Sequence, residues 1–301
     1  MADKIEIAIP CYNEEATVVK VVSDFREAIP NADIVVYDNN SSDATAERAL
    51  QAGARVARVN QQGKGHVVEA IFETTDADVV IMVDGDDTYE AQDVVKLIEE
   101  LEEDGADMVI GTRLQNGTGE FRPMHYFGNR LLTRTLNLIF GTRHRDILSG
   151  YRAFSRRFIE NVPVLSNGFE VETELMVQAL ENGMGVAEIP IRFRDRPEGS
   201  VSKLRTIRDG YRIIVMMVTL FRDHRPLFAF SIAGLVSALA GAPLWLLGFL
   251  YGEQSKLFTL FRNVGATMIM LTLGLFLVGL ILNTINTRFR ELQTLAKRKR
   301  L

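Results

Sequence analysis

The stretch Val79-Val80-Ile81-Met82-Val83-Asp84-Gly85-Asp86-Asp87-Thr88-Tyr89 decides the fold of this chain. Its apolar first half predicts a buried strand of a parallel sheet over residues 78–83. Its second half places three carboxylates within four residues. These acids stand at the carboxyl end of the strand, which is where open α/β sheets bind their ligands.

The acidic residues of this stretch predict a metal site. Carboxylates this close repel one another unless a cation joins them, and oxygen ligands suit Mg²⁺ or Mn²⁺. A metal held by one or two carboxylates keeps positions open for substrate phosphates. We therefore expect Asp86 and Asp84 to be the ligands, with an acidic surface turn as the alternative. An EF-hand calcium loop is excluded, because Tyr89 stands where that loop needs glycine.

The composition of the 301 residues limits the class of protein. The formal net charge is −5, which gives no reason to expect nucleic acid as a partner. Charged segments alternate with apolar runs in the first two thirds, whereas the last third holds two long uncharged stretches. This split predicts a soluble domain followed by a membrane segment. Cys11 is the only cysteine, so an intrachain disulfide is excluded.

Strand and helix patterns alternate along the first two thirds of the chain. The expected helices include residues 18–25, 44–52, 91–103 and 170–182 and one that ends at residue 72. The expected strands cover residues 5–10, 34–37, 55–59, 78–83, 107–111 and 186–193. This order predicts an α/β domain whose parallel sheet has helices on both faces.

Polar clusters follow three of these strands, at residues 11–15, 38–43 and 84–89. The loops at the carboxyl ends of parallel strands share one edge of the sheet, so the clusters converge. They predict a nucleotide site in which the acids hold a metal and a diphosphate. The loop Gly63-Lys64-Gly65 lacks the spacing of a Walker A loop, so it is either a phosphate loop or a plain tight turn.

Several of these motifs occur together in one known family. They are Pro10-Cys11-Tyr12-Asn13-Glu14-Glu15, Asp38 to Asp43, Gly63-Lys64-Gly65 and Asp84-Gly85-Asp86. In their order and spacing the chain resembles the family 2 glycosyltransferases, which implies a GT-A-type, Rossmann-like catalytic domain. Three later motifs resemble the polyprenyl-phosphate glycosyltransferases, a branch that includes dolichyl-phosphate mannose synthase and bacterial undecaprenyl-phosphate sugar transferases. These motifs are Asp146 to Arg152, Phe169 to Glu174 and Gly199 to Leu204.

The resemblance implies a donor site for a nucleotide sugar. The form Asp38-Asn39-Asn40-Ser41 departs from the many members that have a second Asp. Together with the additional Asp87-Thr88-Tyr89, it looks closest to enzymes that use UDP-N-acetylglucosamine. UDP-glucose and GDP-mannose are the alternative donors. The donor-binding residues that the resemblance implies are Pro10, Tyr12, Glu14, Asp38, Asn39, Lys64, Asp84, Gly85 and Asp86.

Arginines are concentrated between residues 113 and 157, within an acidic protein. Their planar side chains suit bidentate binding of phosphate, and a solvated basic helix is the alternative. By resemblance, Arg130, Arg145 and Ser149 bind the phosphate of the acceptor, so they join Asp84 and Asp86 as catalytic residues. Arg194, Arg196 and Lys203 follow in a loop that either closes over the diphosphate or is merely solvated.

The last third of the chain predicts attachment to a membrane. Residues 203–225 mix basic and apolar side chains like an interfacial amphipathic helix, with a core helix as the alternative. Residues 226–301 hold two spanning stretches, at about 227–251 and 263–287. Lys and Arg flank this hairpin, so both termini and the catalytic domain, residues 1–202, are expected on the cytoplasmic side of the inner membrane.

Together these features predict a membrane-bound inverting glycosyltransferase. It would move a sugar from a nucleotide diphosphate to polyprenyl phosphate, with undecaprenyl phosphate as the first choice, for glycosylation of the cell envelope. Two alternatives come from other classes: a sugar nucleotidyltransferase and a non-catalytic membrane protein that binds nucleotide sugars. The sequence leaves open the sugar, the prenyl chain length and the oligomeric state, a homo-oligomer included.

Overall fold

The computed structural model describes residues 4–103, 105–113, 123–197, 222–250 and 256–298, together with residues 215, 218 and 219. For residues 123–127 and 290–298 it describes the backbone alone. The chain divides into two compact units, Met1–Ile213 and Ile214–Leu301.

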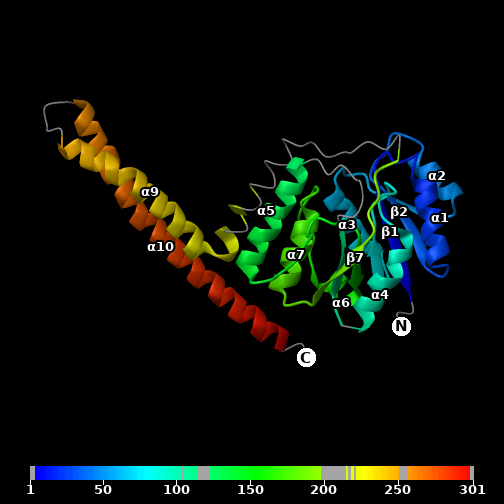
Figure 1. The fold of residues 1–301 in the computed structure, drawn as a ribbon. Coiled ribbons are helices and arrows are strands. Elements are labelled where there is room, and N and C mark those ends of the chain that lie inside the picture. Colours follow the sequence, from blue (N-terminus) through cyan, green and yellow to red (C-terminus); the bar gives the residue numbers. More distant parts are fainter. Residues whose placement is uncertain are drawn as a thin grey trace. The chain divides into compact units, whose positions relative to one another are not determined.

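A sheet of seven strands forms the centre of the described part of the first unit (Figure 1). The strands lie in the order β3-β2-β1-β4-β6-β5-β7. Neighbouring strands are parallel from β3 to β4, and β5 is parallel to β7, which confirms the predicted α/β fold. The strands are β1 (Ile5–Cys11), β2 (Asp33–Asp38), β3 (Arg55–Arg58), β4 (Val79–Met82), β5 (Met108–Arg113), β6 (Arg152–Ser155) and β7 (Val186–Ile191).

Strand β6 differs from the expectation of a wholly parallel sheet, because it runs antiparallel to β4 and β5. Arg152, its first residue, pairs with Met82 at the end of β4 and with Ile110 in β5. The chain therefore enters β6 from the edge at which β4 and β5 end. This reversal brings the loop before β6 to the same edge as the acidic turn after β4.

Helices cover both faces of the sheet, because the strands are apolar on both sides. On one face, alternate residues of β1 share a core with α1 and α4. The buried positions of α1 are Val18, Val21, Val22 and Phe25, which recur at the spacing of one helix face. The other face carries α3 and α7, which contact each other. The helices of this unit are α1 (Val18–Ala28), α2 (Thr45–Gln51), α3 (Lys64–Thr74), η1 (Ala91–Asp93), α4 (Val94–Glu103), α5 (Pro123–Phe140), α6 (Arg156–Asn161) and α7 (Val171–Glu181).

The second unit contains a helical hairpin of α9 (Pro226–Leu250) and α10 (Lys256–Arg298). Three glycines of α9, seven residues apart, let the helices approach closely. A Cβ atom at Gly241, for example, would lie 2.9 Å from the carbonyl oxygen of Gly265. The hydroxyl of Thr272 adds a hydrogen bond of 3.0 Å to the carbonyl oxygen of Gly234. The small residues thus fix the side on which the two helices meet.

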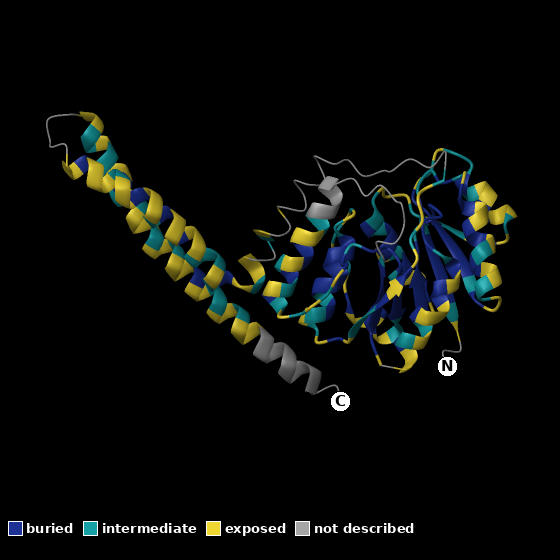
Figure 2. Ribbon diagram, in the orientation of Figure 1, coloured by how far each residue is buried: buried dark blue, intermediate teal, exposed yellow. Residues whose placement is uncertain are grey.

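Both helices are long and apolar enough to cross a membrane. A core helix of a soluble protein with this composition would be mostly buried. Here only 17% of the most apolar window of α9 and 11% of that of α10 are buried, and Figure 2 shows exposed residues along both. The hairpin therefore has the features of a membrane anchor. Most of the amphipathic helix expected at residues 203–225 lies outside the described residues.

Candidate active site

The acidic turn after β4 separates its three carboxylates. Asp86 is buried, and its Oδ1 accepts hydrogen bonds from the hydroxyl and the backbone N–H of Thr88, at 2.6 and 3.2 Å. Its Oδ2 forms an ion pair with Arg196. Asp87 has a positive φ of 58° and directs its carboxylate to Lys20 of α1, at 2.8 Å. The turn thus leaves Asp84 and Asp86 as the acids at the edge of the sheet.

Asp84 is held on both sides. Its Oδ1 lies 2.6 Å from the ammonium of Lys64. Its Oδ2 packs against Gly150, where a Cβ atom would overlap the carboxylate. The next residue, Gly85, packs against Cys11 just as closely, and its carbonyl oxygen accepts a hydrogen bond from Thr17 at 2.6 Å. Glycine is therefore required at both positions to place the carboxylate of Asp84.

The pair Asp84 and Asp86 fits a hard divalent cation. Burial raises the pKa of Asp86, and the charge of Asp84 raises it further. A cation that joins the two would relieve both effects. Among the described residues no group of three or more His, Cys, Asp or Glu side chains could hold a metal. A metal held by this pair would have two carboxylate ligands, which suits an ion that keeps other positions for water and phosphate oxygens.

Lys64 connects this pair to α7. Its ammonium lies 2.6 Å from Asp84 and 2.6 Å from Glu172, and it is only 10% exposed. The glycines on either side of it, Gly63 and Gly65, pack against the backbone of residues 166–167, where any Cβ atom would overlap a carbonyl oxygen. The loop is therefore more than a plain tight turn, because it carries a buried cation to the acidic site.

Asn39 holds this glycine loop in place. Its side-chain N–H donates to the carbonyl oxygen of Gln61 at 2.7 Å, and its Oδ1 accepts from the backbone N–H of Gly63 at 2.7 Å. An aspartate could accept the second bond but could not donate the first. This explains in physical terms why Asn stands here where many family members have Asp.

The remaining donor-side residues lie on the loops after β1 and β2. Asp38 and Glu14 are buried, whereas Pro10 and Tyr12 are partly exposed. Asp38 Oδ1 accepts a hydrogen bond from the backbone N–H of Ser41 at 3.3 Å. Among the described residues, the non-glycine positions with positive φ are Asn13, Asn40 and Asp87, one in each of the three predicted loops. Such strain gathers at functional sites, and here it marks the edge of the sheet that the sequence predicts.

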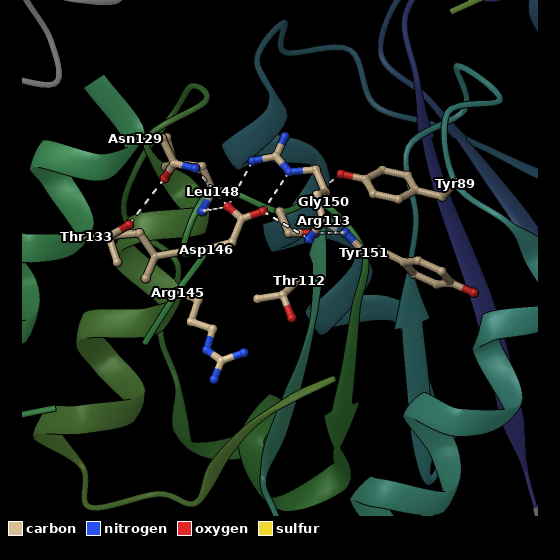
Figure 3. Close-up of polar contacts among 12 residues, drawn as sticks. Tyr89, Thr112, Arg113, Asn129, Thr133, Arg145, Asp146, Leu148, Gly150 and Tyr151 are labelled. Atoms are coloured by element: carbon tan, nitrogen blue, oxygen red, sulfur yellow. Dashed lines mark hydrogen bonds and ion pairs between the residues drawn. The ribbon is translucent and has the colours of Figure 1, made fainter. Parts of the chain in front are cut away.

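A second charged cluster lies beside the acidic turn and is built on Arg113 and Asp146 (Figure 3). The guanidinium of Arg113 donates two hydrogen bonds to the carboxylate, at 2.7 and 2.9 Å. Asn129 of α5 donates to the same carboxylate at 3.0 Å, and the backbone N–H of Leu148 does so at 3.3 Å. Burial would raise the pKa of Asp146, but the charge and hydrogen bonds of Arg113 outweigh it and lower that pKa.

Tyr89 joins this second cluster to the acidic turn. Its ring packs on Tyr151 and Phe193, with centroids 5.3 and 5.4 Å away. Its hydroxyl oxygen accepts a hydrogen bond from the backbone N–H of Gly150 at 3.1 Å. Burial raises the pKa of Tyr89 to about 12, so its hydroxyl stays protonated at neutral pH. Neither Arg113 nor Tyr89 is among the predicted site residues, although Tyr89 directly follows the acidic turn and Arg113 begins the segment rich in arginine.

The predicted acceptor residues Arg130, Arg145 and Ser149 lie on α5 and on the loop that contains Asp146. Ser149 is fully buried. Arg130 follows Asn129 on α5 and is exposed. Arg145 is also exposed; Glu188 of β7 fixes its backbone N–H at 3.0 Å, and Figure 3 shows its side chain directed away from the Arg113–Asp146 pair. Any joint contact of these three side chains with a phosphate stays a prediction.

The loop after β7 reaches the acidic turn. Arg194 donates to Glu90 at 2.6 Å through its Nε, and its backbone N–H donates to the carbonyl oxygen of Thr88 at 2.8 Å. Arg196 lies on Asp86. Two of the three predicted loop cations therefore contact the acidic turn, and Lys203 lies outside the described residues.

We expect Arg113→Met to destabilise the protein. It would leave Asp146 charged and buried, and breaking a buried pair in this way costs about 3–5 kcal/mol in the free energy of unfolding. Arg113 lowers the pKa of Asp146 in the folded protein. The pair therefore stabilises the wild type fully above the pKa that Asp146 has in the unfolded chain, and this stabilisation is lost as pH falls through its folded pKa. Without Arg113 this contribution is absent, so the difference in stability between wild type and variant should shrink as pH falls through the folded pKa of Asp146. Thermal unfolding of the full chain in detergent, measured against pH, tests both effects.

Arg157→Met is the matched control for this substitution. Arg157 pairs with Asp107 at 3.2 Å, but its side chain is 65% exposed. Asp107 is buried but keeps hydrogen bonds from Ser155 and from the backbone N–H of Gly185, so this variant should lose much less stability than Arg113→Met. Equal losses in the two variants would contradict a central role for the Arg113–Asp146 pair.

Comparison with known proteins places the chain in a family. The family model described as glycosyl transferase family 2 matches residues 6–162. Glycosyltransferase AglJ of Haloferax volcanii is 39% identical over 241 residues, which are 79% of this chain and 79% of that protein. The dolichyl-phosphate hexose transferase of the same organism is 31% identical over 194 residues, which are 64% of this chain and 84% of that protein.

A solved structure has the same fold. Glucosyl-3-phosphoglycerate synthase from Mycobacterium tuberculosis, in complex with Mn²⁺ and uridine-diphosphate-glucose, superimposes with a TM-score of 0.58. The match covers 72% of this chain and 78% of that one, at 22% sequence identity. The matched family model, the relatives and the GT-A-like fold agree: this chain is a glycosyltransferase and belongs to glycosyl transferase family 2.

Proposed function

We propose that the chain is a membrane-bound, metal-dependent inverting glycosyltransferase that transfers a sugar from a nucleoside diphosphate to a polyprenyl phosphate. One observation carries this proposal: a single chain joins the two-carboxylate site of Asp84 and Asp86 to a pair of apolar helices that face outward. A soluble acceptor would not need the second feature. A relative whose name includes dolichyl-phosphate as acceptor supports the same choice.

Asp84 and Asp86 would hold the divalent ion, for which Mn²⁺ in a structural neighbour is support and Mg²⁺ is the alternative. When bound, the ion would stabilise the negative charge of the leaving nucleoside diphosphate. The protein sets this up by keeping the two carboxylates together at the edge of the sheet. Thr88 orients one of them, and Lys64 with Gly150 orients the other.

The acceptor phosphate would be the nucleophile. A phosphate monoester has a second pKa near 6, so it is already anionic at neutral pH and needs no general base. Its oxygen would attack the anomeric carbon from the face opposite the leaving group. Arg130 and Arg145 would hold this phosphate by charge-assisted hydrogen bonds. Ser149 is a weaker candidate for direct contact with the phosphate than the two arginines, because its side chain is buried in the loop that carries Arg145.

UDP-N-acetylglucosamine is the donor that we propose first, with UDP-glucose and GDP-mannose as alternatives. The loops of Tyr12, Asp38 and Lys64 lie on the donor side of the acidic pair. The side chain of Asn39 already binds the glycine loop, so recognition of the base would come from its neighbours. Membership of a glycosyltransferase family leaves no support for a nucleotidyltransferase or a non-catalytic receptor.

The proposal is tested by product analysis. The purified full chain is incubated with undecaprenyl or dolichyl phosphate, Mn²⁺ or Mg²⁺, and each of the three nucleotide sugars, and the lipid product is identified by mass. We expect a polyprenyl-phosphate sugar from one donor. Asp86→Asn should reduce turnover at least about a hundredfold, because it removes a charged metal ligand that supplies several kcal/mol. Asp87→Asn, the matched control, alters the carboxylate that binds Lys20 and should lose far less. Sugar transfer to a soluble acceptor alone would contradict the proposal.

The acceptor side has its own test. Arg145→Lys keeps the charge but loses the planar fork of donors, and each bond to a charged group is worth about 1.5–3 kcal/mol. The KM for polyprenyl phosphate should therefore rise at least tenfold, while binding of the nucleotide sugar stays nearly unchanged. Arg143→Lys, on an exposed neighbour in the same segment, is the control. Weaker binding of the nucleotide sugar with an unchanged KM for the lipid would show that Arg145 contacts the donor and not the acceptor.

The positive residues around the hairpin predict its topology. Arg222 and Arg225 precede α9, and Lys297 to Arg300 end the chain, so the catalytic domain and both termini would lie in the cytoplasm. A cysteine replacing Gln254, between the helices, should react in intact cells with a thiol reagent that does not cross membranes. Cys11 is buried and should stay unlabelled. Reaction only after lysis would reverse the orientation.

A further inference from the structure

The side chain of Tyr89, the last residue of the acidic turn, reaches the loop before β6 (Figure 3). Its hydroxyl oxygen accepts a hydrogen bond from the backbone N–H of Gly150 at 3.1 Å. Gly150 in turn packs on the Oδ2 of Asp84, so closely that a Cβ atom would overlap the carboxylate. The acid that begins the turn and the tyrosine that ends it therefore contact the same glycine.

The N–H of Gly150 depends on this tyrosine for its hydrogen bond. The carbonyl oxygen of the preceding residue, Ser149, has a different partner, because it accepts from the Nε of the buried Arg152 at 2.9 Å. Among the described residues, the partner of the Gly150 N–H is the hydroxyl of Tyr89. Gly150 is buried, so loss of that hydroxyl would leave a backbone donor unsatisfied, which is unfavourable.

Packing holds the ring of Tyr89 independently of its hydroxyl. The residue is 6% exposed, and its ring lies against those of Tyr151 and Phe193. Its backbone also forms a bridge with Phe193, directly after β7. Burial raises the pKa of Tyr89 to about 12, so at neutral pH the hydroxyl adds no negative charge beside Asp84. The hydroxyl can therefore be removed while the ring keeps its contacts.

We propose that Tyr89 is a positioning residue whose hydroxyl holds Gly150 against Asp84, so that a metal-binding carboxylate and the loop of residues 145–150 are placed together. The inference rests on the proposed function in one respect, namely that Asp84 and Asp86 hold a metal. It adds that the loop before β6 and the metal site are coupled through one side chain. Loosening the loop then weakens metal binding, and by linkage metal binding stabilises the position of the loop.

Binding of Mn²⁺ to the full chain in detergent, without donor or acceptor, tests this role by the loss of the free-ion EPR signal. Tyr89→Phe keeps the ring but removes the acceptor of the Gly150 N–H. It should raise the Kd for Mn²⁺ about fivefold, which corresponds to the net contribution of one hydrogen bond. Thermal unfolding is measured alongside, because a merely structural role would lower the unfolding temperature without changing the Kd.

Tyr151→Phe is the matched control for this substitution. It removes a hydroxyl from the neighbouring ring of the same aromatic cluster. That hydroxyl donates to the carbonyl oxygen of Ala91 at 3.5 Å, and Figure 3 shows it directed away from Gly150. This variant should leave the Kd for Mn²⁺ nearly unchanged.

Hydrogen exchange gives a second test, part of which needs no variant. In the wild type, exchange in peptides that cover residues 149–151 should slow when Mn²⁺ is added, because the ion fixes Asp84 beside Gly150. In Tyr89→Phe the same peptides should exchange faster and lose this response, whereas Tyr151→Phe should keep it.

The outcomes separate this inference from the proposed reaction. A Kd for Mn²⁺ that is unchanged or lower in Tyr89→Phe, or raised equally in Tyr151→Phe, would overturn the role of Tyr89. Exchange at residues 149–151 that does not respond to Mn²⁺ in the wild type would do the same. Absence of Mn²⁺ binding in the wild type would remove the metal site and this role together. If the expected Mn²⁺ effects appear but no polyprenyl-phosphate sugar forms, the positioning role stands and the proposed reaction falls.

Discussion

The repulsion between Asp84 and Asp86 is the constraint on which the rest of this site depends. Two carboxylates are brought to one edge of the sheet, and one of them is nine-tenths or more buried. Such a pair stays ionised only if positive charge comes with it. The chain supplies that charge from two distant places, through Lys64 at the start of α3 and Arg196 after β7. These ion pairs attach the glycine loop of residues 63–65, helix α7 and the loop after β7 to the pair Asp84 and Asp86.

The antiparallel direction of strand β6 brings a second loop, the one before β6, to the acidic turn. Because β6 starts where β4 and β5 end, the residues before it must lie against the acidic turn. Gly150 then packs on Asp84, and Tyr89 packs on Tyr151. A further parallel connection in place of this reversal would have carried the loop to the opposite edge. The reversal of one short strand therefore decides which residues lie against the acidic turn.

Much of this arrangement can be predicted from the sequence, because it depends on local patterns. The apolar run that ends at Asp84 specifies a buried strand, and the polar clusters after three strands specify the edge where ligands bind. The pairing of β6 depends on contacts far apart in the chain and leaves no periodic signal in four residues. The same holds for Arg113 and Asp146, whose pairing across 33 positions depends on the fold. Burial of Ser149 is likewise a tertiary property, and a motif alone cannot reveal it.

The pairing of Arg113 with Asp146 also has an electrostatic consequence for the loop of residues 143–149. Asp146 is buried beneath this loop, and unpaired it would repel any anion that approaches the loop. Arg113 neutralises that carboxylate through two hydrogen bonds, and Asn129 and Leu148 bind its remaining lone pairs. The exposed Arg143 and Arg145 then dominate the local potential. Within this loop the charge of Asp146 is compensated by Arg113, and the carboxylate of Glu188 accepts the backbone N–H of Arg145. The carboxylates Asp84 and Asp86 and the exposed arginines of the loop are thus kept as separate regions of opposite charge.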